Sequence, residues 1–143
     1  MNTKQVIVMR KDLNMRKGKM IAQGSHASMA FLTKYGRMEH DIEYGHFDLH
    51  TYSFSNMGIH IREHFESIRH WLRNSFRKIC VYVNSEEELE AVHQKALDNG
   101  LISHMIVDNG ATEFNGVKTK TCAAIGPHLD KKFEGITDHL PLL

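Results

Sequence analysis

The chain begins with the apolar stretch Gln5-Val6-Ile7-Val8-Met9, which is rich in β-branched residues and predicts a buried strand. A polar turn spans residues 11–17, and the spacing beyond it predicts a helix from about Gly18 to Tyr35. Because the apolar residues of this helix spread over most of its circumference, we expect it to be covered on several sides and packed against a sheet. A strand followed by a packed helix is the opening of an α/β domain.

The rest of the chain continues this alternation. Ser85 followed by Glu88 is a capping box, and Gly100 stands where a glycine commonly ends a helix. Other patterns predict a helix over 59–74, strands over 78–83, 102–107 and 119–125, and a short helix over 127–133 after Gly126-Pro127 stops the last strand. The order predicts an α/β fold in which residues 1–143 form a single domain, with a four-stranded mixed sheet flanked by helices.

Size and composition are those of a soluble globular protein. The 143 residues suit one domain, and 41% apolar with 24% charged residues is an ordinary balance. No apolar stretch approaches the roughly 20 residues that cross a bilayer. No signal-peptide pattern precedes the first strand, so we expect a cytoplasmic protein that does not associate with membranes. Cys80 and Cys122 each lie in an apolar run, and we expect both to be buried strand residues that stay reduced.

Positive charge is concentrated in the first quarter of the chain. Residues 1–37 hold eight Lys and Arg but only one acid, Asp12, which gives a net charge of +7 there against +1 for the whole chain. Such asymmetry favours an anionic partner, of which nucleic acid is the common case, although a solvated basic face gives the same pattern. The residues that we expect to bind such a partner are Arg10, Lys11, Arg16 and Lys17.

The start of the first predicted helix carries cations where they destabilise it. A helix N-terminus has partial positive charge, so Arg16, Lys17 and Lys19 are poorly placed for helix stability. A local rule broken in this way often marks a functional site. A bound anion, held by free backbone N–H groups and cationic side chains, is the simplest compensation. Lys19, Gln23 and His26 also share one face of this helix.

A second polar segment follows the third predicted strand. Asp108 stands where that strand ends, and Thr112 comes just after the Asn109-Gly110 turn. Ligands collect outside the carboxyl ends of strands in open α/β sheets, so Lys19 and Asp108 face one cleft if the first and third strands run parallel. The plainer alternatives are that Asp108 only closes an Asx-turn, and that Gln23 and His26 are satisfied polar residues at a helix edge.

Four of these side chains suit the hydrolysis of an ester. A carboxylate at Asp108 orients or deprotonates water, and an ammonium at Lys19 stabilises the oxyanion that develops. Thr112 and Gln23 position water or substrate. No Cys, and no Ser in a Gly-x-Ser-x-Gly context, competes as a nucleophile.

The two segments resemble those of the archaeal and eukaryotic type of peptidyl-tRNA hydrolase, the second family with that activity. The resemblance covers residues 3–35 and 70–143 and rests on Lys17–Met20, Gln23-Gly24-Ser25-His26-Ala27, Asp108-Asn109-Gly110-Ala111-Thr112, Thr119-Lys120-Thr121, Ile125-Gly126-Pro127 and His139-Leu140-Pro141-Leu142. It implies cleavage of the ester between a peptide and the terminal ribose of tRNA, without a metal or other cofactor. It also implies a homodimer as one expected assembly. The catalytic residues that it implies by position are Lys19, Gln23, Asp108 and Thr112, supported by Ser25 and His26.

The chain departs from this family pattern at two positions and in one segment. Gly24 stands where the family usually has Cys, and Glu113 stands where it usually has Gln. We expect the added negative charge of Glu113 to weaken the attraction for phosphate. Residues 36–66 are interpreted as an insertion between the first two helices, about whose contacts the resemblance implies nothing.

Two other functions compete with the hydrolase. His60-Ile61-Arg62-Glu63-His64 matches the H-x-x-E-H pattern of one zinc peptidase class, and His46 and His50 repeat its spacing. In a chain with eleven histidines such pairs arise by chance, and no third ligand is evident, so we expect no metal site. The second competitor is a non-catalytic protein of the same fold that uses the basic cleft to bind RNA or a protein partner.

Overall fold

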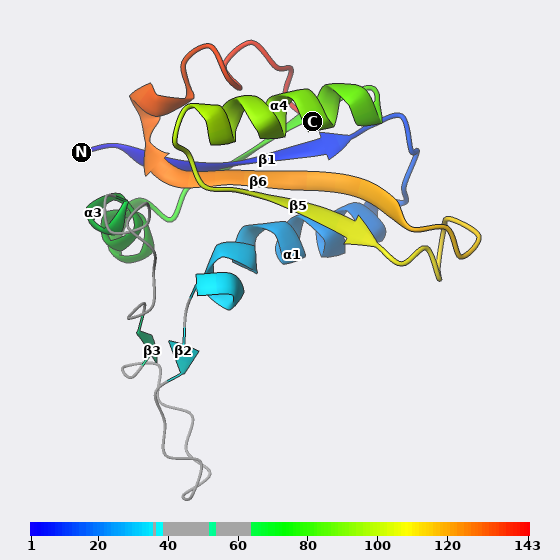
Figure 1. Ribbon diagram of the computed structural model, residues 1–143, viewed down its shortest axis with the longest axis horizontal. Coiled ribbons are helices and arrows are strands. Elements are labelled where there is room, and N and C mark those ends of the chain that lie inside the picture. The colour runs from blue at the N-terminus through cyan, green and yellow to red at the C-terminus, as the bar shows by residue number, and fades with distance from the viewer. Residues whose placement is uncertain (36, 39–51, 54–63) are drawn as a thin grey trace, which may run out of the picture.

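Strand β1 (Thr3–Arg10) lies inside the main sheet, where its apolar run places it. The computed structural model describes residues 1–35, 37–38, 52–53 and 64–143, and it shows this sheet between helices on both faces (Figure 1). The α/β class with a four-stranded mixed sheet, predicted from the sequence, is confirmed. The other strands of the sheet are β4 (Lys78–Val83), β5 (Ser103–Asp108) and β6 (Thr119–Leu129).

The helices and the remaining short elements complete the described chain. Two short strands, β2 and β3, form a separate antiparallel pair. These elements are α1 (Lys17–Tyr35), β2 (Arg37–Met38), β3 (Tyr52–Ser53), α3 (Phe65–His70), the π-helical turn η3 (Trp71–Ser75), α4 (Glu86–Asp98) and the 3-10 helix η4 (Asp130–Phe133).

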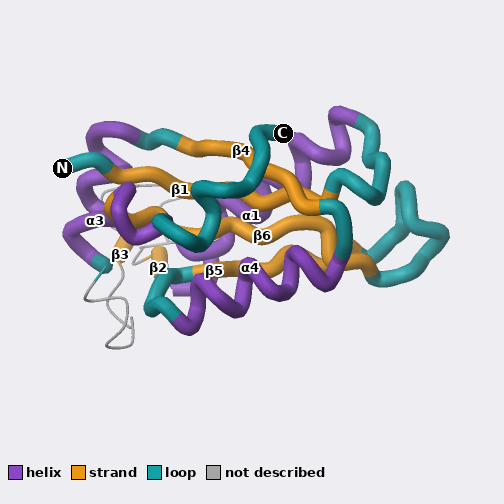
Figure 2. The backbone as a smooth tube through the Cα atoms, turned by 90° about the horizontal axis from the view of Figure 1, so that it is seen from above, coloured by secondary structure: helices purple, strands orange, loops and turns teal. Residues whose placement is uncertain are grey.

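The direction of the strands decides where functional side chains gather. The strand order is β4-β1-β6-β5, which Figure 2 shows from above. β1 pairs in parallel with β4 and antiparallel with β6, and β6 pairs antiparallel with β5. β5 therefore runs in the same direction as β1 and β4. The carboxyl ends of these three strands lie together, at what we call the carboxyl end of the sheet.

The core is divided between the two faces of the sheet. Side chains alternate across a strand, so Val6 and Val8 of β1 pack with Leu89 of α4 on one face. Ile7 packs with Ala27 of α1 on the other face. The sheet is thus buried on both sides, with α4 above it and α1 below it in the view of Figure 1.

β6 does not stop at Gly126-Pro127, where the sequence predicted its end. The strand continues through this dipeptide, and only at Asp130 does the short helix η4 begin. On β1, Gln5 alone faces the dipeptide, because the pairing register shifts there. Such a β-bulge admits both a proline, which has no N–H to pair, and a glycine with positive φ. Gly126 has a φ of 86°, which an L side chain rarely adopts.

Two expectations about burial are wrong because α1 leaves one strand uncovered. α1 packs on β6, β5 and β1, so no helix among the described residues covers the same face of β4. Cys80 of β4 is consequently exposed, whereas Cys122 of β6 is buried as expected. Ile21 and Met29 of α1 are 70% and 56% exposed. The described residues therefore bury the helix along one face, and do not cover it on several sides as the sequence predicted.

The helix predicted over residues 59–74 is described only in its second half. It begins as α3 at Phe65 and continues as the π-helical turn η3 to Ser75. Residues 59–63 lie outside the described residues. The same holds for most of the interpreted insertion over 36–66, which stays a prediction.

Candidate active site

The start of α1 and the end of β5 meet at the carboxyl end of the sheet. Lys19 Nζ donates a hydrogen bond to Asp108 Oδ1 at 2.9 Å and another to Thr112 Oγ1 at 2.8 Å. Lys19 and Asp108 are 89 residues apart in the chain. Their contact follows from the common direction of β1 and β5, because the turn after β1 delivers α1 to the end where β5 finishes.

Gln23 joins the same cluster from the next turn of α1. Its Nε2 donates to Asp108 Oδ1 at 3.1 Å, and its Oε1 accepts from Thr121 Oγ1 at 2.6 Å. Gln23 is only 3% exposed, and these two bonds fix which way its amide points. Thr121 of β6 was not identified as a site residue from the sequence. The signal that was available is its place in the Thr-rich strand of the family pattern.

The loop after β5 holds the other carboxylate oxygen of Asp108. Gly110 N donates to Asp108 Oδ2 at 2.9 Å, so Asp108 does close an Asx-turn in addition to its contacts with α1. Gly110 has a φ of 80°, and a Cβ there would lie 2.2 Å from the Val117 carbonyl oxygen. Only glycine fits at this position. The turn that holds the Asp108 carboxylate in place therefore requires Gly110.

The four predicted side chains Lys19, Gln23, Asp108 and Thr112 therefore form one connected group, which we call the Lys19–Asp108 cluster. The side chains of Lys19 and Asp108 are 13% and 11% exposed, whereas Thr112 is exposed to solvent. The cluster is thus open to solvent at Thr112. The ring of Phe114, whose centroid is 5.7 Å from Lys19 Nζ, adds an apolar neighbour to the ammonium.

Electrostatics keep the Asp108 carboxyl ionised. The hydrogen bond from Lys19 is the largest cause that lowers the pKa of Asp108 below its ordinary value of 3.8, and the bonds from Gly110 N and Gln23 lower it further. A carboxylate with a lowered pKa is a weak proton acceptor at neutral pH. The geometry therefore favours Asp108 as a group that orients water and the Lys19 ammonium.

Ser25 and His26 lie outside the Lys19–Asp108 cluster. Ser25 Oγ donates to the carbonyl oxygen of Ile21 within α1 at 2.8 Å, and the residue is exposed. His26 is exposed as well. Their supporting role stays a prediction.

The four predicted tRNA-binding cations lie at the carboxyl end of the sheet but differ in their surroundings. Arg10 donates to both carboxylate oxygens of Asp12 and to the Lys120 carbonyl, and its side chain is only 12% exposed. Lys11 Nζ lies 4.3 Å from the centroid of the Tyr82 ring. Lys11, Arg16 and Lys17 are exposed, so these three are better placed than Arg10 to meet a phosphate.

Glu113, the acid that departs from the family pattern, is paired with a cation. Arg16 Nε donates to Glu113 Oε1 at 2.7 Å, and the pKa of Glu113 is lowered chiefly by this bond. The Arg16 side chain is 80% exposed, and that of Glu113 is 13% exposed. The negative charge that the sequence places beside the cluster is therefore offset by its neighbour in the structure.

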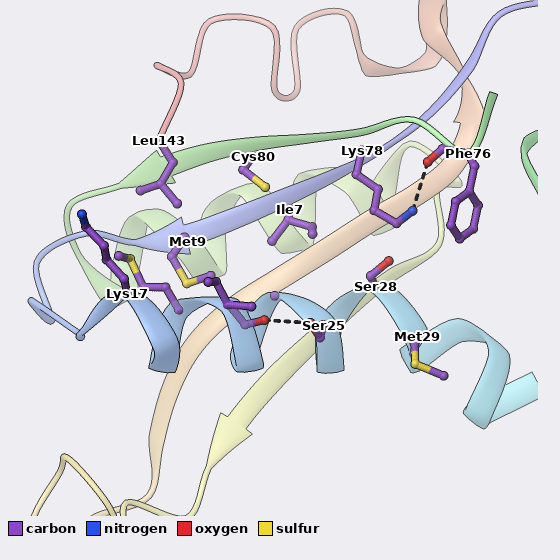
Figure 3. Close-up of a pocket in the computed structure, with 13 residues that line it drawn as sticks. Ile7, Met9, Lys17, Ser25, Ser28, Met29, Phe76, Lys78, Cys80 and Leu143 are labelled. Carbon is purple, nitrogen blue, oxygen red and sulfur yellow. Dashed lines mark hydrogen bonds between the residues drawn. The ribbon is translucent and has the colours of Figure 1, made fainter.

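A hollow of about 620 Å³ lies on the opposite flank of α1 and is almost entirely apolar. Figure 3 shows side chains of α1 on one side of it and those of β1 and β4 on the other. None of the four members of the Lys19–Asp108 cluster lines it. Its lining includes Lys17, Ile21, Gly24 and Met29 of α1 together with Lys78 and Cys80 of β4. We call it the β4-flank pocket.

Neither a metal cluster nor a membrane helix is found among the described residues. Within them, no three His, Cys, Asp or Glu side chains come together to hold an ion. Of the predicted H-x-x-E-H motif only His64 is described; it is buried, with its ring centroid 4.6 Å from that of His128. In this part of the chain, no helix has the length and apolarity to span a bilayer.

Comparison with known proteins gives one consistent family. A family model described as peptidyl-tRNA hydrolase PTH2 matches residues 3–143. A peptidyl-tRNA hydrolase of Methanocaldococcus jannaschii is 38% identical over 141 residues, which cover 98% of this chain and 99% of that protein. A peptidyl-tRNA hydrolase of Methanopyrus kandleri is 33% identical over 141 residues, which cover 98% of this chain and 97% of that protein. A probable peptidyl-tRNA hydrolase 2 of Dictyostelium discoideum is 30% identical over 97% of this chain and 54% of its own length.

Proposed function

This chain belongs to the peptidyl-tRNA hydrolase PTH2 family, and from that premise we propose that it hydrolyses the ester between a peptide and tRNA. Free peptide and tRNA are the products, and no metal or other cofactor takes part. The observation that carries the proposal is the 2.9 Å contact between Lys19 and Asp108, made from opposite halves of the chain. Gln23 and Thr112 complete the catalytic group through their bonds to these two residues.

In the proposed reaction, water adds to the carbonyl carbon of the ester. Lys19 uses two of its three N–H donors within the cluster. Its third N–H donates to the carbonyl oxygen as negative charge develops there. Thr112 accepts a hydrogen bond from Lys19, so its own proton is available to the oxyanion or to the water. Asp108 orients the attacking water. The C–O bond then breaks, and the ribose oxygen leaves with a proton from the water.

We propose that exposed cations beside the cluster bind the phosphates of tRNA. Lys11, Arg16 and Lys17 carry most of this binding, while the largely buried Arg10 mainly orders the turn after β1. Phosphate contacts release counterions, so affinity for tRNA falls steeply as salt rises. Lys17→Ala should reduce the slope of log affinity against log salt by about 1. Lys95 is an exposed lysine of α4. Lys95→Ala is therefore the control, and it should leave the slope of log affinity for tRNA against log salt unchanged.

The enzymatic proposal is tested with peptidyl-tRNA and purified variants. Asp108→Asn and Lys19→Ala should each lower kcat/KM by about a hundredfold or more, because oxyanion and water-positioning groups contribute on that scale. Asp98→Asn and Lys95→Ala, exposed residues of α4, should leave it unchanged. Circular dichroism and thermal melts establish that the variants are folded. Tight tRNA binding without turnover by the unmodified protein would instead support the non-catalytic alternative.

We further propose that the protein works in the cytoplasm as a homodimer. A role in translation and the composition of the chain support this location. Light scattering coupled to gel filtration tests the dimer, and a mass of one chain at micromolar concentration would contradict it. Imaging of a tagged protein in its own cell tests the location.

A further inference from the structure

The two edge strands of the main sheet, β4 and β5, differ in how far their outer backbone groups are paired. At the β4 edge, the C-terminal residues form an extra pairing: Leu142 bridges Val81, Tyr82 N donates to the Pro141 carbonyl at 3.1 Å, and Leu143 N donates to the Cys80 carbonyl at 3.0 Å. The backbone of this edge strand is therefore largely occupied. β4 also carries Lys78, a charge of the kind that protects edge strands from further pairing.

The β5 edge has no such cover among the described residues. In the part of the chain that the structure describes, β5 pairs with β6 alone, and the short β2-β3 ladder is a separate sheet. The stretch from Ser103 to Asp108 contains neither Lys nor Pro, which commonly block edge pairing. The Ile102 carbonyl accepts from Gly126 N at 2.8 Å and so faces β6. Because backbone groups alternate sides along a strand, Ser103 and Met105 turn their N–H and C=O groups outward.

This open edge leads directly to the Lys19–Asp108 cluster. Asp108 is the last residue of β5. If the ester carbonyl of a peptidyl group lies beside the cluster, the residues that precede it in the peptide can lie along the outer edge of β5. A groove of about 690 Å³ runs beside the strand, between it and α4. Its lining comes from α4, β5 and β6 and includes charged groups: Glu87, Glu90, Ala91, His93, Gln94, Met105, Val107 and Lys120. Val107 is 52% exposed, an apolar strand side chain that lacks cover.

We propose that the peptide of the substrate binds as a fifth strand along the outer edge of β5, parallel to it. This inference rests on the proposed function. The parallel direction follows from chemistry: the C-terminal carbonyl of the peptide is the ester carbonyl and lies at the carboxyl end of β5. Alternate peptide side chains face the groove beside α4. Strand addition recognises main-chain groups, so binding of this kind depends little on the side chains of the peptide.

The first test compares substrates of different peptide length on the unmodified enzyme. An N-acetyl-aminoacyl-tRNA offers β5 a single amide, whereas an N-acetyl-tetrapeptidyl-tRNA offers four along an extended backbone. We expect kcat/KM to rise about tenfold from the first to the second, mainly through KM, as two net hydrogen bonds predict. Equal values for both would overturn the inference and leave the proposed hydrolase intact. Failure to hydrolyse either substrate would instead overturn the proposed function.

The second test distinguishes strand pairing from general contact with the groove. In an extended peptide, alternate residues point their N–H groups toward β5. In the tetrapeptide, N-methylation of one alternating pair (first and third, or second and fourth residues) should remove the rise in kcat/KM with peptide length. Methylation of the other pair should preserve that rise. Loss at every position, or at none, contradicts pairing along β5.

A third measurement locates the pairing on the protein. A stable mimic joins the same tetrapeptide to an RNA minihelix through an amide in place of the ester. On binding this mimic, the outward amide of Met105 should exchange hydrogen at least tenfold more slowly, while a mimic with a single acetylated residue should have no effect there. Unchanged exchange at Ser103 and Met105, with binding verified by titration, would overturn the proposal.

Discussion

Helix α1 has two unlike flanks. On the β5 flank, Lys19 and Gln23 are bonded to groups from β5 and β6 and are largely shielded from water. On the β4 flank, Ile21 and Met29 are exposed around a hollow of about 620 Å³ that is almost entirely apolar. This apolar hollow offers little polar chemistry. The reactive site that we propose is therefore marked by partnered charges, and not by the volume of a hollow.

The difference arises from what the sheet presents to each flank. β5 ends in Asp108 and is followed by Gly110 and Thr112, while β6 offers Thr121 beneath α1. On the other flank β4 presents Cys80, which has no charged partner among the described contacts and whose pKa is raised by partial burial. In the function that we propose, the same helix therefore serves catalysis on its β5 flank only. Substitutions on the two flanks should accordingly differ in their effect on activity.

The largest effect is expected at the glycine that holds the Asp108 turn. Gly110→Ala places a Cβ 2.2 Å from the Val117 carbonyl oxygen, so the turn must open and the bond to Asp108 Oδ2 is lost. We expect kcat/KM to fall more than about a hundredfold and the free energy of unfolding to fall by about 2–4 kcal/mol. Activity assays and urea unfolding measure both quantities.

Gly116→Ala is the matched control for this change. Gly116 also has positive φ, at 77°, but an added Cβ meets nothing within 4 Å. The Gly116→Ala variant should lose only about 1–2 kcal/mol of stability through backbone strain. Its kcat/KM should stay unchanged. Equal losses of activity in the two variants would show that positive φ, and not the Asp108 turn, is what matters.

The next effect concerns pH. Because the pKa of Asp108 is lowered in the fold, its contribution to stability is complete above its ordinary value of 3.8 and is lost as pH falls through the lower folded value. The hydrogen bond from Lys19 is the largest cause of this lowering. Lys19→Ala removes that bond, so it should raise the pKa of the Asp108 carboxyl. Carbon NMR of the labelled carboxyl follows the titration directly. An unchanged titration in Lys19→Ala would mean that the contact does not persist in solution.

A smaller effect is expected at a positioning residue. Thr121→Val keeps the shape of the side chain but removes the 2.6 Å bond to Gln23 Oε1, leaving a buried carbonyl oxygen unpaired. We expect a loss of about 1–3 kcal/mol in stability and about tenfold in kcat with little change in KM. Thr119→Val on the same strand, whose hydroxyl bonds the Val117 carbonyl, is the control. A pure stability loss with normal kcat would refute the positioning role.

The smallest effect is expected on the other flank of α1. Gly24→Ala directs a Cβ toward Met9 and Ile7 at 3.8–4.0 Å, which is ordinary contact. Alanine favours a helix over glycine by about 0.5–1 kcal/mol, so a thermal melt should show a small stabilisation while kcat/KM stays unchanged. A marked loss of activity would mean that the β4-flank pocket takes part in the reaction.

The strand directions explain how much of this site was predictable. The buried run of β1, the capping of α4 by Ser85 and the end of β5 at Asp108 are local patterns, and they suffice to place Lys19 near Asp108 once β1 and β5 run the same way. Thr121 was missed because its contact with Gln23 depends on the register of β6, which shifts beside Ile106. Register depends on pairing across the sheet, which no single segment encodes.

Other errors have the same origin. An apolar run around Cys80 predicts a strand but does not reveal that α1 leaves that strand uncovered. A Gly-Pro pair predicts the end of a strand, yet a bulge opposite Gln5 lets β6 continue. The roles of Ser25 and His26, and the insertion over 36–66, stay predictions.

The most direct test is a double-mutant cycle on kcat/KM for peptidyl-tRNA with Lys19→Ala, Asp108→Asn and the double variant. If the two residues act as one unit, the double variant should be about as slow as the slower single variant, because either change already disables the pair. Losses that simply add would contradict the account, since Lys19 and Asp108 would then act independently despite their contact.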